Sequence, residues 1–127
     1  MSTIYVNAQS NTGTVTASFP QAGAVPSVTP ALMSLQVSQA GPTQGPNAKV
    51  TIWDGPVGSG TVIFATWLQG SGTGSVGNVQ DISLPRDTKG NQCIQALPGN
   101  QMNVQVTGTG ANQVSVNCRF QDGLPGD

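Results

Sequence analysis

Two stretches near the C-terminal end of the chain, 102–107 and 114–120, alternate strictly between apolar and polar residues. Their apolar positions are Met102, Val104, Val106, Val114, Val116, Cys118 and Phe120. Strict alternation over two runs, joined by the glycine-bearing segment TGTGAN, predicts an antiparallel β-hairpin with one apolar and one polar face. Further strands must cover that apolar face, so the pattern favours an all-β fold.

Shorter runs of the same kind recur along the rest of the chain. They predict strands at 4–8, 15–19, 33–37, 50–53, 61–69, 82–84 and 93–97. The 17 Gly and nine Pro supply turns between these runs, and the sequence contains no Glu and no long helix-favouring segment. We therefore predict one domain, residues 1–127, built as an antiparallel β-sandwich or jelly roll of about eight or nine short strands.

Two segments are not expected to form strands. Residues 20–31 contain three prolines, which exclude a central strand and predict an extended connection over the surface. Residues 121–127 are rich in Gly and Pro and predict a flexible tail.

The stretch 61–69 (TVIFATWLQ) is apolar on both of its alternating faces. Val62, Phe64 and Leu68 share one face, and Ile63, Ala65 and Trp67 share the other. A strand that is apolar on both sides is either central in a sandwich or covered by a partner.

Five apolar residues are candidates for an interface with another protein. They are Phe19, Val25, Trp53, Ile63 and Trp67. The two tryptophans stand opposite the cleaner apolar faces of their strands, and aromatic side chains are enriched at interfaces. Packing in the core of the domain is the alternative interpretation for both.

The charge content limits which partners the chain can have. Four Lys or Arg and five Asp or Glu give a net charge of −1. Because four cationic side chains cannot neutralise a phosphate backbone, we expect no nucleic-acid partner. The apolar runs are too short to span a membrane, and MSTIYVNAQS has no signal-peptide pattern. We expect synthesis in a cytoplasm without a signal peptide; removal of a signal before this sequence is the alternative.

The sequence lacks the groups that most enzymes use. It contains no His, and Asp54 with Asp81 is the only carboxylate pair at distinct strand ends. Two Cys without His cannot complete a zinc site, and the Asp residues of 122–127 lack calcium-loop spacing. We expect no catalytic residues, no metal, no cofactor and no enzymatic activity.

Cys93 and Cys118 lie on two different predicted strands. They are a candidate disulfide pair. A reducing compartment favours free thiols instead, and Cys118 would then act as a small apolar residue on its strand.

The stretch 48–120 contains AKVTIWDG, GTVIFATWL, DISLPRDTKGNQCIQALPGNQMNVQVTG and VSVN. This combination of a strand–Asp-Gly turn–strand unit with the later Pro98–Val104 segment resembles small β-sandwich structural proteins of tailed-bacteriophage virions. The resemblance implies a capsid decoration (cement) protein. Such a protein is commonly a homotrimer, binds the major capsid protein and resides in the virion.

The leading hypothesis is thus a non-enzymatic virion protein that binds the outside of a phage capsid and stabilises it. One alternative is a carbohydrate-binding or adhesin-type module in which Trp53 or Trp67 stacks on a sugar. A second alternative is a subunit of a phage tail tube or fibre.

Overall fold

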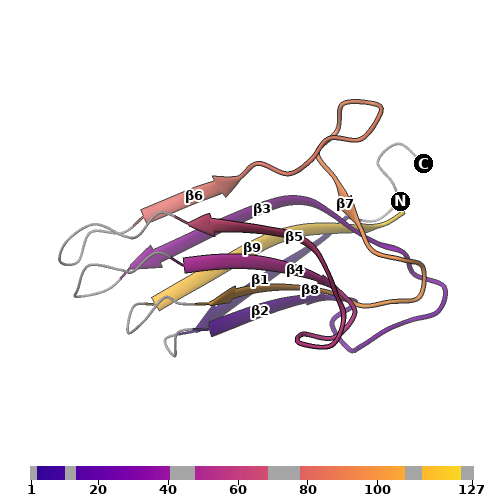
Figure 1. The fold of residues 1–127 in the computed structure, drawn as a ribbon, viewed down its shortest axis with the longest axis horizontal. Coiled ribbons are helices and arrows are strands. Elements are labelled where there is room, and N and C mark those ends of the chain that lie inside the picture. Colours follow the sequence, from indigo (N-terminus) through magenta and orange to yellow (C-terminus); the bar gives the residue numbers. More distant parts are fainter. Residues whose placement is uncertain (1–2, 11–13, 41–47, 69–77, 108–112, 124–127) are drawn as a thin grey trace.

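The computed structural model of the chain describes residues 3–10, 14–40, 48–68, 78–107 and 113–123. These residues form β-strands and loops without a helix, and the strands pack as two antiparallel sheets (Figure 1). The strands are β1 (Thr3–Ser10), β2 (Thr14–Phe19), β3 (Pro30–Ala40), β4 (Ala48–Asp54), β5 (Thr61–Leu68), β6 (Asn78–Ile82), β7 (Ile94–Gln95), β8 (Met102–Thr107) and β9 (Gln113–Asp122). The predicted all-β sandwich is confirmed.

The strand order is that of a jelly roll. One sheet has the order β1-β9-β3-β6, with the short β7 pairing to β3, and the other has the order β2-β8-β4-β5. Most consecutive strands therefore lie in opposite sheets, and β4 with β5 is the pair of sequence neighbours joined as a hairpin in the described chain. Two such sheets, with four main strands each and connections that cross between them, are the double-sheet arrangement of jelly rolls.

The predicted C-terminal hairpin is wrong. Strand β8 pairs with β2 and β4, whereas β9 pairs with β1 and β3 in the other sheet. The alternation nevertheless identified the buried face of each strand correctly, because every apolar position of both runs is buried. Alternation reports which face of a strand is covered. It does not report which strand lies beside it, so two strands facing each other across a core give the same signal as a hairpin.

The core lies between the two sheets and consists of aliphatic side chains around Phe120, which is fully buried. The ring of Phe19 stacks on that of Phe120, with 5.2 Å between ring centroids and 12° between ring planes. Phe19 is half-buried and packs against the core. The Phe19 side chain therefore contributes to the core of the domain.

A β-bulge in β3 changes which of its residues face the core. Leu32 pairs with Phe120 and Ser34 pairs with Arg119, so Met33 is the extra residue. Leu32 takes the core position that alternation assigned to Met33. The bulge was not predicted because it inserts one residue without any change in composition.

The ends of several predicted elements differ in the structure. Strand β9 continues to Asp122, two residues into the predicted tail. Oδ1 of Asp122 accepts a hydrogen bond of 2.8 Å from the backbone N of Thr29, which holds this end of the strand against the connection before β3. Residues 124–127 of the predicted tail lie outside the described residues. Residues 20–29 form turns and no strand, and β3 already begins at Pro30. The predicted strand at 93–97 is reduced to the two residues of β7.

Within the part of the chain that the structure describes, no helix is long and apolar enough to cross a membrane.

Candidate functional site

The outer face of the four-stranded sheet carries an apolar patch along β5. On the β4–β5 ladder Trp53 pairs with Val62, Thr51 with Ala65, and Lys49 with Trp67. Trp67 is 68% exposed and Val62 is 47% exposed. We call Trp53, Val62, Ala65 and Trp67 the tryptophan patch.

A second bulge places Val62 in this patch. Ile52 pairs with Phe64 while the next residue, Trp53, pairs with Val62, so Ile63 has no partner on β4. The prediction that Val62 shares a face with Phe64 and Leu68 is therefore wrong. Ile63 is half-buried and packs against the core instead of joining Trp67 on the outer face.

The two tryptophans have different surroundings. Trp53 is half-buried, and its indole Nε1 donates a hydrogen bond of 3.4 Å to Oε1 of Gln105 on β8. Trp67 lies on the edge strand, where Nζ of Lys49 sits 5.5 Å from its ring centroid, within the range of a cation–π contact. Lys49 is the charged residue beside a patch that is otherwise apolar.

Among the five interface candidates, Trp53 and Trp67 lie on the outer face of the four-stranded sheet, four residues apart along the β4–β5 ladder. Phe19 and Ile63 pack against the core, and Val25 is 39% exposed in the connection between β2 and β3. Val62 is the patch residue that the sequence reasoning missed. The register shift that exposes it has no signature in the sequence.

Strand β5 is an edge strand, not a central one. Among the described strands it pairs with β4 alone, so the backbone groups along its other edge have no strand partner there. Its eight residues, TVIFATWL, include no charge and no proline. Charges, prolines and bulges are the usual means by which edge strands avoid pairing with other chains. Apart from the bulge at Ile63, β5 has none of these features, and no described strand covers its outer edge.

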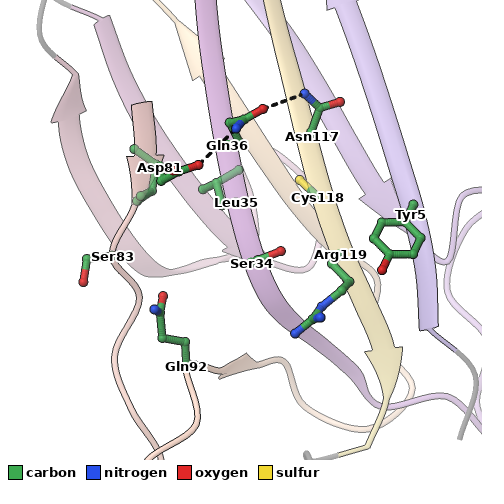
Figure 2. A pocket seen from close by; sticks show the side chains of 11 residues that line it. Tyr5, Ser34, Leu35, Gln36, Asp81, Ser83, Gln92, Asn117, Cys118 and Arg119 are labelled. Atoms are coloured by element: carbon green, nitrogen blue, oxygen red, sulfur yellow. Dashed lines mark hydrogen bonds between the residues drawn. The ribbon is translucent and has the colours of Figure 1, made fainter. Parts of the chain in front are cut away.

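The outer face of the five-stranded sheet is polar and carries a row of linked side chains (Figure 2). Gln36 Nε2 donates to Asp81 Oδ1 at 3.1 Å, and Asn117 Nδ2 donates to Gln36 Oε1 at 3.4 Å. Asn7 Nδ2 in turn donates to Asn117 Oδ1. A carboxylate can only accept, so Asp81 fixes the orientation of each amide in the row. We call these four residues, one from each main strand of the sheet, the amide row.

Beside the amide row lies a pocket of about 440 Å³, which we call the Arg119 pocket. It forms where β6 ends at Ile82 and the chain leaves the sheet before β7 begins. Its rim is held in place by Gln92, whose Oε1 accepts a hydrogen bond of 3.1 Å from the backbone N of Leu84. Other lining residues are Tyr5, Ser34, Gln36, Asp81, Asn117 and Arg119.

Arg119 is the cation of this pocket, and its Nε is buried without a hydrogen-bond partner among the described residues. An unsatisfied buried donor costs about 1–3 kcal/mol. Tyr5, which pairs with Arg119 across β1 and β9, is 76% exposed at the pocket's edge. The side chains of this pocket come together only through strand pairing, which is why the sequence did not point to it.

The two carboxylates considered for catalysis do not face each other. Asp54 lies on β4 and Asp81 on β6, in different sheets. Asp54 accepts hydrogen bonds from the backbone N of Leu97 at 3.1 Å and from Nδ2 of Asn100 at 2.8 Å, so it anchors a turn. Among the described residues no group of three or more His, Cys, Asp or Glu side chains could hold a metal.

Both cysteines are free thiols in this structure. Cys118 is buried on β9, and burial raises the pKa of its thiol to about 12. Burial, and secondarily the charge of Asp87, also raise the pKa of the half-buried Cys93. Neither thiol is therefore activated as a nucleophile.

The chain matches no protein-family model, and no curated protein sequence matches it significantly. Solved structures of viral proteins are similar to it at low identity. A chain of the infectious bursal disease virus Gx strain matches with 14% identity and a TM-score of 0.46, over 98% of this chain and 32% of that one. This chain thus spans about a third of the length of that viral chain.

Two further similarities are to the Tobacco streak virus coat protein and to a chain of the virus-like particle of the giant freshwater prawn Macrobrachium rosenbergii extra small virus. The coat protein matches with 11% identity and a TM-score of 0.37, over 97% of this chain and 88% of that one. The extra small virus chain matches with 12% identity and a TM-score of 0.32, over 97% and 79% of the two chains. At these values the similarities do not by themselves assign a function.

Proposed function

We propose that this chain is a non-enzymatic structural protein of a virion, which binds the outer surface of a phage capsid and stabilises it. The observation that carries the proposal is the tryptophan patch beside the edge of β5 that no described strand pairs with. Trp67 and Val62 expose large apolar surfaces there, on a strand that has neither charge nor proline. Exposed apolar surface next to unpaired backbone groups suits a binding surface for another protein.

The energetics suit attachment in many copies. Burial of an apolar side chain of this size stabilises an interface by about 1.5–3 kcal/mol before the costs of association. One small patch therefore gives a weak contact. Simultaneous contacts made by linked copies add by multivalency, as expected for a homotrimer on a capsid surface that repeats its binding site.

The composition and topology are consistent with this role. A net charge of −1 gives little electrostatic resistance to dense packing of identical copies. Double-sheet jelly rolls occur in viral capsid domains, although the fold is shared with proteins of other functions. Because residues 48–120 resemble phage decoration proteins, we propose the exterior of the capsid as the binding site and the major capsid protein as the partner. The protein would be made in the host cytoplasm and reside in the virion.

Sedimentation velocity of the purified protein tests the self-association part of the proposal. We expect a discrete trimer for the wild-type chain. Trp67→Ser should weaken that trimer if the tryptophan patch takes part in it. Val79→Thr is the matched control, because Val79 is 64% exposed on β6 in the other sheet. A wild-type monomer at all concentrations would contradict the homotrimer.

Two other candidate functions make different use of the same surface. The exposure of Trp67 favours a carbohydrate-binding module in which the indole stacks on a sugar ring. Glycan binding that disappears in Trp67→Ala would support this module. The edge of β5 that has no partner among the described strands favours a tail-tube or fibre subunit, which would sediment as an open polymer instead of a trimer.

A further inference from the structure

The two edges of the four-stranded sheet differ in how well their inward side chains are covered. At the β2 edge, Val15 and Ala17 are 6% and 1% exposed, and β2 packs against β1 and β9 of the other sheet. At the β5 edge, Phe64 and Thr66 also face inward, because they pair with fully buried residues of β4, yet both are only half-buried. The core of the sandwich is therefore covered at the β2 edge and open along the middle of β5.

The backbone of β5 presents hydrogen-bonding groups along the same edge. In an antiparallel ladder, alternate residues direct their N–H and C=O groups to opposite sides of the strand. One set of β5 residues thus bonds to β4, and the other set points towards an edge where no described strand lies. A row of such groups matches the backbone of one further strand, which adds to the sheet by β-augmentation.

An added strand would also cover the exposed part of the core. Its side chains alternate between two faces, so those on its inner face would lie beside Phe64 and Thr66. Apolar side chains at these positions would remove the remaining inward surface of β5 from water. On the outer face, a β-branched side chain would pack well beside Val62. The partner that fits this edge is thus an extended segment with an apolar inner face.

The charges of β4 give the β4–β5 ladder a positive end. Lys49 pairs with Trp67, and its Nζ lies 5.5 Å from the centroid of that ring. Asp54, at the other end of β4, is occupied by its hydrogen bonds from the backbone N of Leu97 and from Asn100. Strand β5 itself has no charge. An acidic side chain opposite Trp67 on an added strand would approach the Lys49 ammonium over the indole ring, whereas a basic one would be repelled.

We propose that β5 binds an extended segment of the capsid protein as a fifth, antiparallel strand of its sheet. The segment is apolar on its inner face and carries an acidic side chain opposite Trp67. Its direction is that of the pairings between the described strands, all of which are antiparallel. This contact rests on the proposed function, which supplies the partner, and adds the backbone pairing that holds the partner in place.

A lysine at Thr66 tests the strand addition. Inward-pointing charges on edge strands block pairing with other chains, because the charged end emerges where the added strand would lie. We expect Thr66→Lys to weaken binding to capsids stripped of this protein at least about tenfold. Thr66→Val keeps the edge free of charge and should bind as the wild type does. Thr16→Lys is the matched control, because it adds the same charge at an exposed position of β2, the other edge strand of the sheet.

These variants separate the added strand from the capsid contact itself. Wild-type affinity in a folded Thr66→Lys protein, together with loss of binding in Trp67→Ser, would overturn the strand addition and leave the proposed function standing. Equal weakening in Thr16→Lys would also overturn it, because the added charge alone would then explain the effect. No capsid binding by the wild-type protein would overturn both. Circular dichroism shows which variants are folded.

Amide hydrogen exchange tests the same pairing in the wild-type protein, without a substitution. In the free protein, the β5 amides that bond to β4 should exchange slowly and the alternate ones fast. In capsid-bound protein both sets should exchange slowly, as read residue by residue by NMR after quenching and release. A contact made only by the side chains of the tryptophan patch would leave the second set fast and would overturn the proposal.

Lys49→Gln tests the acidic side chain of the partner. Salt screens an attraction between exposed charges, so the affinity of the wild-type protein for capsids should fall as the ionic strength rises. Lys49→Gln should bind about two- to fivefold more weakly at low salt, and its affinity should fall less with ionic strength. Lys89→Gln, at an exposed position outside the two sheets, is the control and should behave as the wild type does. Equal salt dependence in Lys49→Gln and the wild type would overturn the acidic position opposite Trp67.

Discussion

Trp53 pairs with Val62 across the β4–β5 ladder, although Ile52, one residue earlier, pairs with Phe64. The extra residue, Ile63, turns inward and packs against the core. This bulge exposes Val62 beside Trp53, on the sheet face that also carries Trp67. The main candidate surface of the protein thus depends on one inserted residue.

Threonine substitutions at Val62 and Ile63 test the position of the bulge. Val62→Thr should change the free energy of unfolding by less than about 0.5 kcal/mol, because Val62 is 47% exposed. Ile63→Thr should lower it by about 1–2 kcal/mol, because it removes apolar surface that packs against the core. Urea denaturation of both variants measures the difference. Equal losses would mean that the register has been assigned incorrectly.

Aspartate substitutions at neighbouring positions of β9 test the faces of this strand. Val116 is fully buried, so Val116→Asp places an unpaired charge in the core and should unfold the domain. Asn117 is exposed in the amide row, and Asn117→Asp should cost no more than about 1 kcal/mol. Circular dichroism and thermal melting distinguish the two. A folded Val116→Asp variant would contradict the described core.

Asp54 is expected to matter for stability and not for catalysis. It accepts two hydrogen bonds from the turn at Leu97 and Asn100, one of them from a backbone N. Asp54→Ala should therefore lower the free energy of unfolding by about 1–3 kcal/mol. Asp81→Ala serves as the control and should cost less than about 1 kcal/mol, because Asp81 is exposed and accepts its hydrogen bond from the amide of Gln36. In urea denaturation, Asp54→Ala should lose more stability than Asp81→Ala. An equal or reversed order would contradict the structural role of Asp54.

The buried thiol of Cys118 predicts a loss of stability in alkali. Its pKa rises from the ordinary value of 9.0 to about 12 on folding. The unfolded chain then releases this proton at lower pH than the folded chain does. Its contribution is full below pH 9 and is lost as pH rises from about 9 to about 12, by up to about 1.4 kcal/mol per pH unit.

Denaturation curves between pH 8 and about 11 measure this slope. The Cys118→Ala variant should be less stable at pH 8 but should lose stability less steeply than the wild type above pH 9. Identical slopes in the two proteins would rule out Cys118 as the source.

The sequence was sufficient to predict the fold class and most buried faces, because alternation follows directly from burial of one side of a strand. It was not sufficient to predict pairing. The faces of β8 and β9 were correct, yet the two strands belong to different sheets. The bulges at Met33 and Ile63 were missed for a related reason, since an inserted residue leaves the local composition unchanged.

The same reasoning found part of the candidate surfaces. Trp53 and Trp67 stood out because large aromatic residues are rare in this chain. Tyr5 and Arg119 did not stand out, because each is an ordinary polar-face residue at one end of the sequence. Only the pairing of β1 with β9 places them side by side.

Co-sedimentation with capsids tests the proposed function most directly. On the proposed function, capsids of the encoding phage would be stripped of this protein and then mixed with wild-type protein, with Trp67→Ser and with the Val79→Thr control. We expect saturable binding of the wild type and of Val79→Thr, and higher thermal stability of the capsids that carry them. Trp67→Ser should show neither effect. Wild-type protein that stays in the supernatant at every concentration would contradict the proposed function.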